Sequence, residues 1–95
     1  MRVVARNVRT RIGEIDLVCL DAAGYAFIEV KTRRAGSFVA ALEAVDRRKA
    51  ERLAVLAESW LARRGERRVP WRILVAALTV SEDGTSVELL PVEVG

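Results

Sequence analysis

Two acidic residues and one lysine have the types and spacing of a site for metal-assisted phosphoryl chemistry. Asp16 lies in one predicted strand, and Glu29 and Lys31 lie on the same face of the next. Carboxylate oxygens suit a hard divalent cation such as Mg²⁺. Such a cation polarises a phosphoryl oxygen and lowers the pKa of a bound water. Lys31 would orient that water or stabilise the charge that develops on the phosphate.

The amino-acid composition removes most other catalytic chemistry. The 95 residues include no histidine and one cysteine, Cys19. A Ser-His-Asp triad, a Cys-His pair, a histidine-ligated zinc and a cysteine cluster are therefore excluded. Carboxylates, lysine, hydroxyls or a cation held by oxygen remain. The lone cysteine also excludes an internal disulfide, which predicts a reducing, cytoplasmic location.

Length and composition predict one globular domain over residues 1–95. Hydrophobic residues make up 52% of the chain and charged residues 31%, which is typical of a folded domain. No segment approaches the roughly 20 apolar residues that span a bilayer, so we expect no membrane partner. A net charge of +3 and a pI near 9.7 permit a nucleic-acid partner.

The hydrophobic pattern predicts five strands and one helix. The strands are expected at residues 2–9, 14–20, 25–32, 71–80 and 87–94, and the helix at residues 47–64. Asp46 is the expected N-cap of this helix and Gly65 its C-terminal stop. The order predicts an α/β domain whose mixed sheet has a three-stranded antiparallel meander, then one long helix, a buried strand and an edge strand. Because one helix covers one face of a sheet, we expect a partner chain, such as a second copy, or a further segment on the other face.

The strands at residues 14–20 and 25–32 are expected to pair as a hairpin in which Leu20 faces Tyr25. Alternation along this hairpin predicts one wholly apolar face. A slip of one residue would bring charged side chains onto that face, so the pattern itself favours this register. The apolar face is predicted to hold Ile15, Leu17, Cys19, Ala26, Ile28 and Val30.

The same register places the charged residues on the other face. Asp16 is expected directly opposite Glu29, with Cβ atoms about 5 Å apart, and Glu14 opposite Lys31. Opposed carboxylates are destabilising unless a cation or a proton lies between them. The alternative is a solvated sheet face with ion pairs from Glu14 and Asp16 to Lys31.

Five basic residues are candidates for contacts with nucleic-acid phosphates. Two of them follow the strand with Glu29, and an ordinary solvated loop is their alternative role. Three begin the predicted helix, where the helix dipole disfavours cations and a nearby anion would stabilise them. Asp46 and Glu43 could already be that anion. The five residues are Arg33, Arg34, Arg47, Arg48 and Lys49.

Three blocks of the sequence, Gly13–Val18, Phe27–Arg33 and Glu43–Lys49, resemble the YraN-like family of small predicted nucleases. That family is similar to archaeal Holliday-junction resolvases and belongs to the restriction-endonuclease-like superfamily. Its signature, an acid on one strand and Glu-x-Lys on the next, matches Asp16, Glu29 and Lys31. The resemblance implies a restriction-endonuclease-like fold and Mg²⁺- or Mn²⁺-dependent hydrolysis of DNA, including branched DNA. Asp16 and Glu29 would ligate the metal with the Val30 carbonyl as a third ligand, and Glu14 would have a secondary role.

The chain departs from the family pattern in two places. The family usually has an N-terminal helix before the first strand, which this chain lacks, so N-terminal truncation or cover by a homodimer partner is expected. The family's Phe-Asp-Val corresponds here to Ile73-Leu74-Val75. Two alternatives to an active nuclease therefore stay open. One is a non-catalytic nucleic-acid-binding module that keeps the fold, and the other is a scaffold that dimerises through its uncovered face.

Overall fold

A computed structural model describes residues 1–36 and 45–94 of the chain. The predicted contribution of Glu43 to the helix start, and residues 37 and 38 of the predicted loop, lie outside the described residues. The elements, in chain order, are β1 (Arg2–Thr10), β2 (Gly13–Asp21), β3 (Gly24–Arg34), α1 (Arg47–Arg63), β4 (Trp71–Ser81) and β5 (Gly84–Val92).

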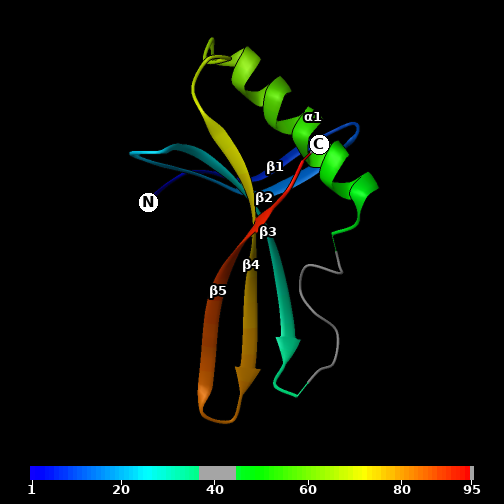
Figure 1. Ribbon diagram of the computed structural model, residues 1–95, viewed down its shortest axis with the longest axis vertical. Helices are drawn as coiled ribbons and strands as arrows, with labels where there is room; N and C mark the ends of the chain where they lie inside the picture. The colour runs from blue at the N-terminus through cyan, green and yellow to red at the C-terminus, as the bar shows by residue number, and fades with distance from the viewer. Residues whose placement is uncertain (37–44, 95) are drawn as a thin grey trace.

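The five strands form one mixed sheet in the order β1-β2-β3-β4-β5 (Figure 1). Neighbouring strands are antiparallel, except that β3 and β4 are parallel. A parallel pair needs a long crossover connection, and α1 lies within that connection. The predicted α/β class, with a meander, one long helix and two further strands, is therefore confirmed.

The helix α1 forms where the apolar spacing predicts it, and its ends are capped as expected. Asp46 is the N-cap, and its Oδ1 accepts a hydrogen bond from the Lys49 backbone N–H at 2.9 Å. Gly65, just beyond the helix, has a φ of 70°, which glycine adopts without steric cost. Leu53 and Leu61 of α1 are buried in the core between helix and sheet.

Aromatic side chains fill that core near the C-terminal half of α1. The Trp60 ring packs edge-on against Tyr25 and Phe27, with ring centroids 5.2 and 5.7 Å away. Trp71, at the start of β4, meets Phe27 at 6.0 Å in the same manner. Such edge-to-face packing adds to the burial of apolar area, and it holds α1 against β3.

The opposite face of the sheet carries a smaller apolar cluster. It contains Cys19, Ala26, Ile28, Leu74 and Ala76, with Leu17, Val30 and Leu78 packed against them. Among the described residues no helix covers this face. The predicted apolar face is thus confirmed except at Ile15, which packs in the helix-side core. The alternation expected along β2 was wrong at that point, because the strand departs from regular pairing at Asp16, as shown below.

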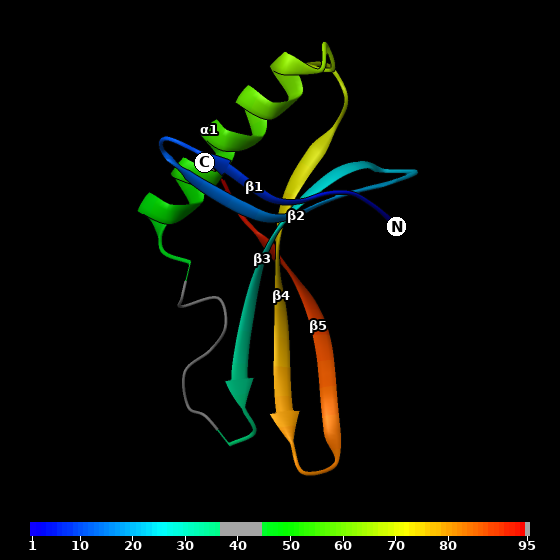
Figure 2. The same cartoon turned by 180° about the vertical axis from the view of Figure 1, so that it is seen from behind.

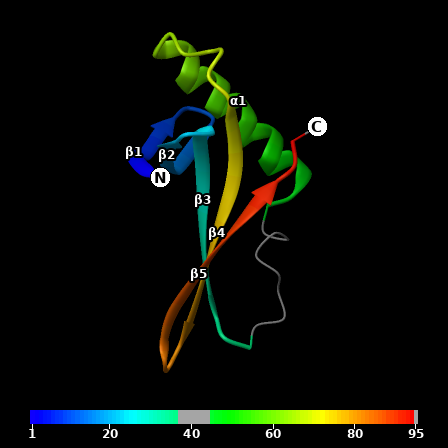
Figure 3. The same ribbon diagram turned by 60° about the vertical axis from the view of Figure 1, so that its left-hand side comes forward.

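The sheet is long and strongly twisted, and α1 lies beside one half of it (Figures 2 and 3). The C-terminal ends of β3 and β4 extend beyond the helix, and the molecule measures 44 Å along its longest axis. In the part of the chain that the structure describes, no helix has the length and hydrophobicity to cross a membrane.

The turn between β2 and β3 lies against the start of β4. The Tyr25 N–H donates to the Pro70 carbonyl at 2.9 Å, and a Cβ at Gly24 would lie 2.1 Å from that oxygen. Gly84, in the turn between β4 and β5, also has a positive φ but has open space around it.

We therefore expect Gly24→Ala to destabilise the fold more than Gly84→Ala does. Both changes strain a backbone with positive φ, and only the first adds a backbone clash. The difference in unfolding free energy should be about 2 kcal/mol, the scale of overpacking in a core. Urea unfolding of the two variants measures it, and equal losses would contradict the role of this contact.

Candidate functional site

The site is built around Glu29, a buried carboxylate on the helix side of β3. Among the described residues Glu29 is the one charged residue in the buried class, with 9% of its surface exposed. It follows Phe27 on the same face of the strand, so its side chain is directed towards α1. A buried charge is strongly destabilising unless it is paired and hydrogen-bonded. The surrounding residues supply that compensation.

Two lysines contact the same oxygen of Glu29. Lys49 Nζ lies 2.7 Å from Glu29 Oε1, and Lys31 Nζ lies 3.5 Å from it. Lys31 comes from β3 itself, whereas Lys49 reaches across from the first turn of α1. The hydrogen bond that Lys49 donates to Glu29 raises the pKa of Lys49 above its ordinary value, although burial of the ammonium acts in the opposite direction. The charge of Asp16 adds a smaller upward effect on the same pKa.

Asp16 lies just beyond the last regular pair of the β2–β3 ladder. That ladder runs from Asp21–Gly24 to Leu17–Ile28 and has the predicted register throughout. Beyond it, Asp16 Oδ2 accepts a hydrogen bond from the Val30 backbone N–H at 2.7 Å. A side chain therefore satisfies an amide that would otherwise lack a partner where the strands separate.

The irregularity at Asp16 extends into β1. Asn7, between the residues that pair with Leu17 and Ile15, has a φ of 48°, the one positive value among the described non-glycine residues. Asparagine tolerates this conformation better than most residues do. The backbone change is located at the level of Asp16, and beyond it Ile15 faces the helix-side core.

The prediction that Asp16 and Glu29 are paired residues in the ladder was wrong. The ladder ends one residue earlier, and Asp16 contacts the backbone of Val30 instead. The structure nevertheless places Asp16 against the part of β3 that carries Glu29, because its carboxylate accepts a hydrogen bond from the backbone N–H of the next residue, Val30. The two acids and Lys31 therefore form one cluster, which also includes Lys49.

Lys49 lies at the start of the helix as predicted, but its side chain makes a contact that the prediction did not include. We expected it to be a phosphate contact at the start of the helix, and its ammonium group lies instead in the acidic cluster. One signal in the sequence pointed to it. The chain has only two lysines, Lys31 and Lys49, and all its other basic residues are arginine.

The remaining predicted site residues lie outside the cluster. Glu14 forms an ion pair with Arg9 of β1 at 3.4 Å rather than with Lys31, and both side chains are exposed. Arg33 Nε lies 3.4 Å from the Thr79 hydroxyl of β4. Arg34 and Arg48 are exposed.

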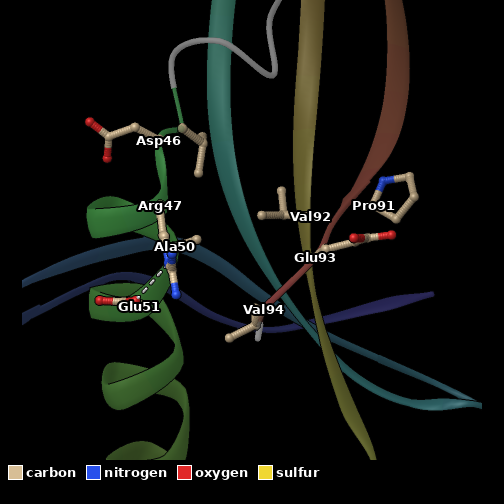
Figure 4. Close-up of a pocket in the computed structure, with 9 residues that line it drawn as sticks. Asp46, Arg47, Ala50, Glu51, Pro91, Val92, Glu93 and Val94 are labelled. Carbon is tan, nitrogen blue, oxygen red and sulfur yellow. Dashed lines mark ion pairs between the residues drawn. The ribbon is translucent and has the colours of Figure 1, made fainter.

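A groove lies beside the start of α1, on the side away from β2. Figure 4 shows it between α1 and the end of β5, with Val92 and Ala50 on opposite walls, and its volume is about 960 Å³. Arg47 lines the groove and is paired there with Glu51 at 3.3 Å. Asp16, Glu29 and Lys31 do not line it, so the candidate site and the groove are separate features.

The donor set of the cluster fits a hydrated divalent cation. Within the described residues, Asp16 Oδ1 and Glu29 Oε2 accept no hydrogen bond, because the contacts of both carboxylates involve the other oxygen. The same residues include no group of three or more acidic or cysteine side chains that could enclose a metal. Mg²⁺ keeps several of its waters and is commonly held by one or two carboxylates, which is what Asp16 and Glu29 offer.

Comparison with known proteins places the chain in a family. The model of uncharacterised protein family UPF0102 matches residues 1–78. A UPF0102 protein of Symbiobacterium thermophilum is 46% identical over 83 residues, which are 87% of this chain and 70% of the relative. Relatives from Nocardia farcinica and Streptomyces griseus are 49% and 51% identical over 76% and 68% of this chain. The matched part spans only 54% and 55% of the length of those two proteins. The chain therefore belongs to UPF0102, the YraN-like family that its three sequence blocks resemble.

Proposed function

We propose that this protein is a divalent-metal-dependent DNA endonuclease that hydrolyses phosphodiester bonds. The observation that supports the proposal is the buried Glu29 carboxylate, which has the ammonium groups of Lys31 and Lys49 on one of its oxygens and is followed by the Val30 amide that Asp16 binds. A sheet face with purely structural charges would place such groups in solvent. Burial of Glu29 places its carboxylate in surroundings of reduced dielectric, where its interactions with charged groups are stronger than in water.

Three residues of the cluster have a defined task in the proposed reaction. Asp16 Oδ1 and Glu29 Oε2 would hold Mg²⁺ or Mn²⁺, which when bound supplies Lewis-acid polarisation and an acidified water. Lys31 has 35% of its side chain exposed, so it is accessible to a phosphate oxygen and would stabilise the negative charge that develops there. The backbone N–H of Val30 donates a hydrogen bond to Asp16 Oδ2 and so holds this carboxylate in position.

The substrate class follows from charge and from the family resemblance. The net charge is +3, and exposed arginines lie close to the site in sequence, at Arg34, the last residue of β3, and at Arg48 in the first turn of α1. Arginine matches phosphate geometry with a planar fork. Activity on branched or recombination DNA is proposed from the resemblance to resolvases alone.

We expect DNA cleavage that requires Mg²⁺ or Mn²⁺, is lost in EDTA, and falls at least about 100-fold in Asp16→Asn and Lys31→Met. The amide introduced by Asp16→Asn keeps an oxygen that accepts the Val30 N–H, so the change removes the carboxylate charge and preserves the strand contact. Gel assays of linear and four-way-junction DNA measure the rates.

The matched control is Asp83→Asn, the same chemical change in the exposed turn between β4 and β5. It should cleave at the rate of the unmodified protein. Cleavage that survives Asp16→Asn would refute the proposed role of Asp16. DNA binding in EDTA, combined with no cleavage in any divalent metal, would identify a binding module instead.

Phosphate contact by the start of α1 gives a second expectation. Arg48→Gln should weaken DNA binding and reduce the slope of log affinity against log salt by about 1. Arg68→Gln is the matched control, since Arg68 is also exposed but follows the opposite end of the 17-residue helix. Fluorescence anisotropy across a salt series measures both. Equal effects of the two changes would place the DNA elsewhere on the surface.

A further inference from the structure

The contact between Lys49 and Glu29 involves a carboxylate that the proposed reaction needs as a metal ligand. Glu29 Oε1 already accepts the Lys49 ammonium at 2.7 Å and lies 3.5 Å from that of Lys31. A divalent cation on Glu29 Oε2 would lie close to the Lys49 ammonium, which binds the other oxygen of the same carboxylate. The cation on Oε2 and the Lys49 ammonium on Oε1 repel each other, so binding of the cation weakens the Lys49 contact.

We propose that Lys49 is an exchangeable counter-ion for Glu29: its ammonium neutralises the buried carboxylate when no divalent cation is bound and is displaced when one binds. The inference rests on the proposed function, because it takes Glu29 to be a ligand of the cation. Lys49 and the cation then compete for Glu29. In the absence of metal the lysine compensates the buried carboxylate, and in its presence the lysine lowers the metal affinity below that of the two carboxylates alone.

The position and chemistry of Lys49 support exchange rather than a permanent ion pair. Its side chain is 35% exposed, so the displaced ammonium can reach water, whereas the side chain of Glu29 is only 11% exposed and cannot follow it. Lysine carries a compact, strongly hydrated charge on a flexible stem, and arginine would make a more rigid, forked contact. This arginine-rich chain has lysine at the two positions that contact Glu29 Oε1.

The helix does not depend on this contact for its start. The N-cap bond joins Asp46 to the backbone N–H of Lys49, and the side chain takes no part in it. The ammonium can therefore leave Glu29 without removing the cap. Once released, the Lys49 ammonium is free to contact a DNA phosphate, as predicted, from the same helical turn as Arg48.

The test measures Mn²⁺ binding in the absence of DNA, with electron paramagnetic resonance used to detect the free ion. Lys49→Gln should bind Mn²⁺ roughly tenfold more tightly than the unmodified protein, the scale of one charge-assisted hydrogen bond. Arg52→Gln removes the same charge from the next turn of α1 and should change the affinity by no more than about twofold, because exposed charges are screened. Lys49→Arg keeps a competing cation and should show no gain.

The outcomes separate the two proposals. Mn²⁺ binding by the unmodified protein with no gain in Lys49→Gln overturns the exchange and leaves the nuclease proposal standing. An equal gain in Arg52→Gln also overturns it, because general charge removal would then explain the effect. Absence of Mn²⁺ binding in every variant overturns the proposed metal site itself.

A measurement on the unmodified protein covers the case in which Lys49→Gln does not fold. With ¹⁵N-lysine labelling, the two lysines give two Nζ resonances, and loss of one in Lys49→Arg assigns it. Addition of Mg²⁺ should shift the Lys49 resonance and speed its hydrogen exchange. A Lys49 signal that stays unchanged while the amide of Val30 shifts would show that metal binds without displacing the ammonium.

Discussion

The buried carboxylate of Glu29 needs a compensating positive charge, and this need determines how the start of α1 is placed on the sheet. Glu29 lies on the helix side of β3 with 9% of its surface exposed, where an unpaired charge would oppose folding. Lys49 provides the closest compensation, and it can do so only if the first turn of α1 lies over the middle of the sheet. The Asp46 cap, which fixes where the helix begins, therefore also fixes which residue reaches Glu29. Packing of Trp60 against Phe27 holds the rest of the helix in the same orientation.

A second contact decides how the strands separate around the cluster. Asp16 takes the Val30 N–H, so β2 can leave β3 without exposing an unsatisfied amide. The C-terminal part of β3, from Glu29 onward, pairs with β4 alone in the described registers. This part carries Glu29 and Lys31, and within the described residues the departure of β2 leaves one side of it without a neighbouring strand. The structure thus combines a regular sheet that buries the core with a local break that holds the charged residues.

The sequence was sufficient for the elements and for most of the register, because those depend on local patterns. Alternation in β2 and β3 predicted the pairs from Leu20–Tyr25 to Leu17–Ile28, and apolar spacing with Asp46 and Gly65 predicted α1. The break at Asp16 could not be predicted in this way. It depends on the left-handed backbone of Asn7 and on the Asp16 side chain, which takes the place of a backbone acceptor for the Val30 N–H. Neither feature can be recognised from the alternation of apolar and polar residues. The place of Lys49 also escaped prediction, since it depends on the angle at which α1 crosses the sheet. The convergence of Asp16, Glu29 and Lys31 was anticipated, although through a ladder pair that does not form.

The short turn between β2 and β3 has a consequence beyond its own local structure. Only Ala22 and Ala23 separate the two strands, and such a turn fixes which residues face each other along the whole hairpin. Asp16 follows the fifth and last pair counted from this turn. One inserted residue would displace the carboxylate along β3 by about 3.3 Å and invert the side on which it projects. The length of this exposed two-alanine turn thus determines where the Asp16 carboxylate lies at the far end of the hairpin. The turn is therefore constrained in length, although its two alanines have no chemical role.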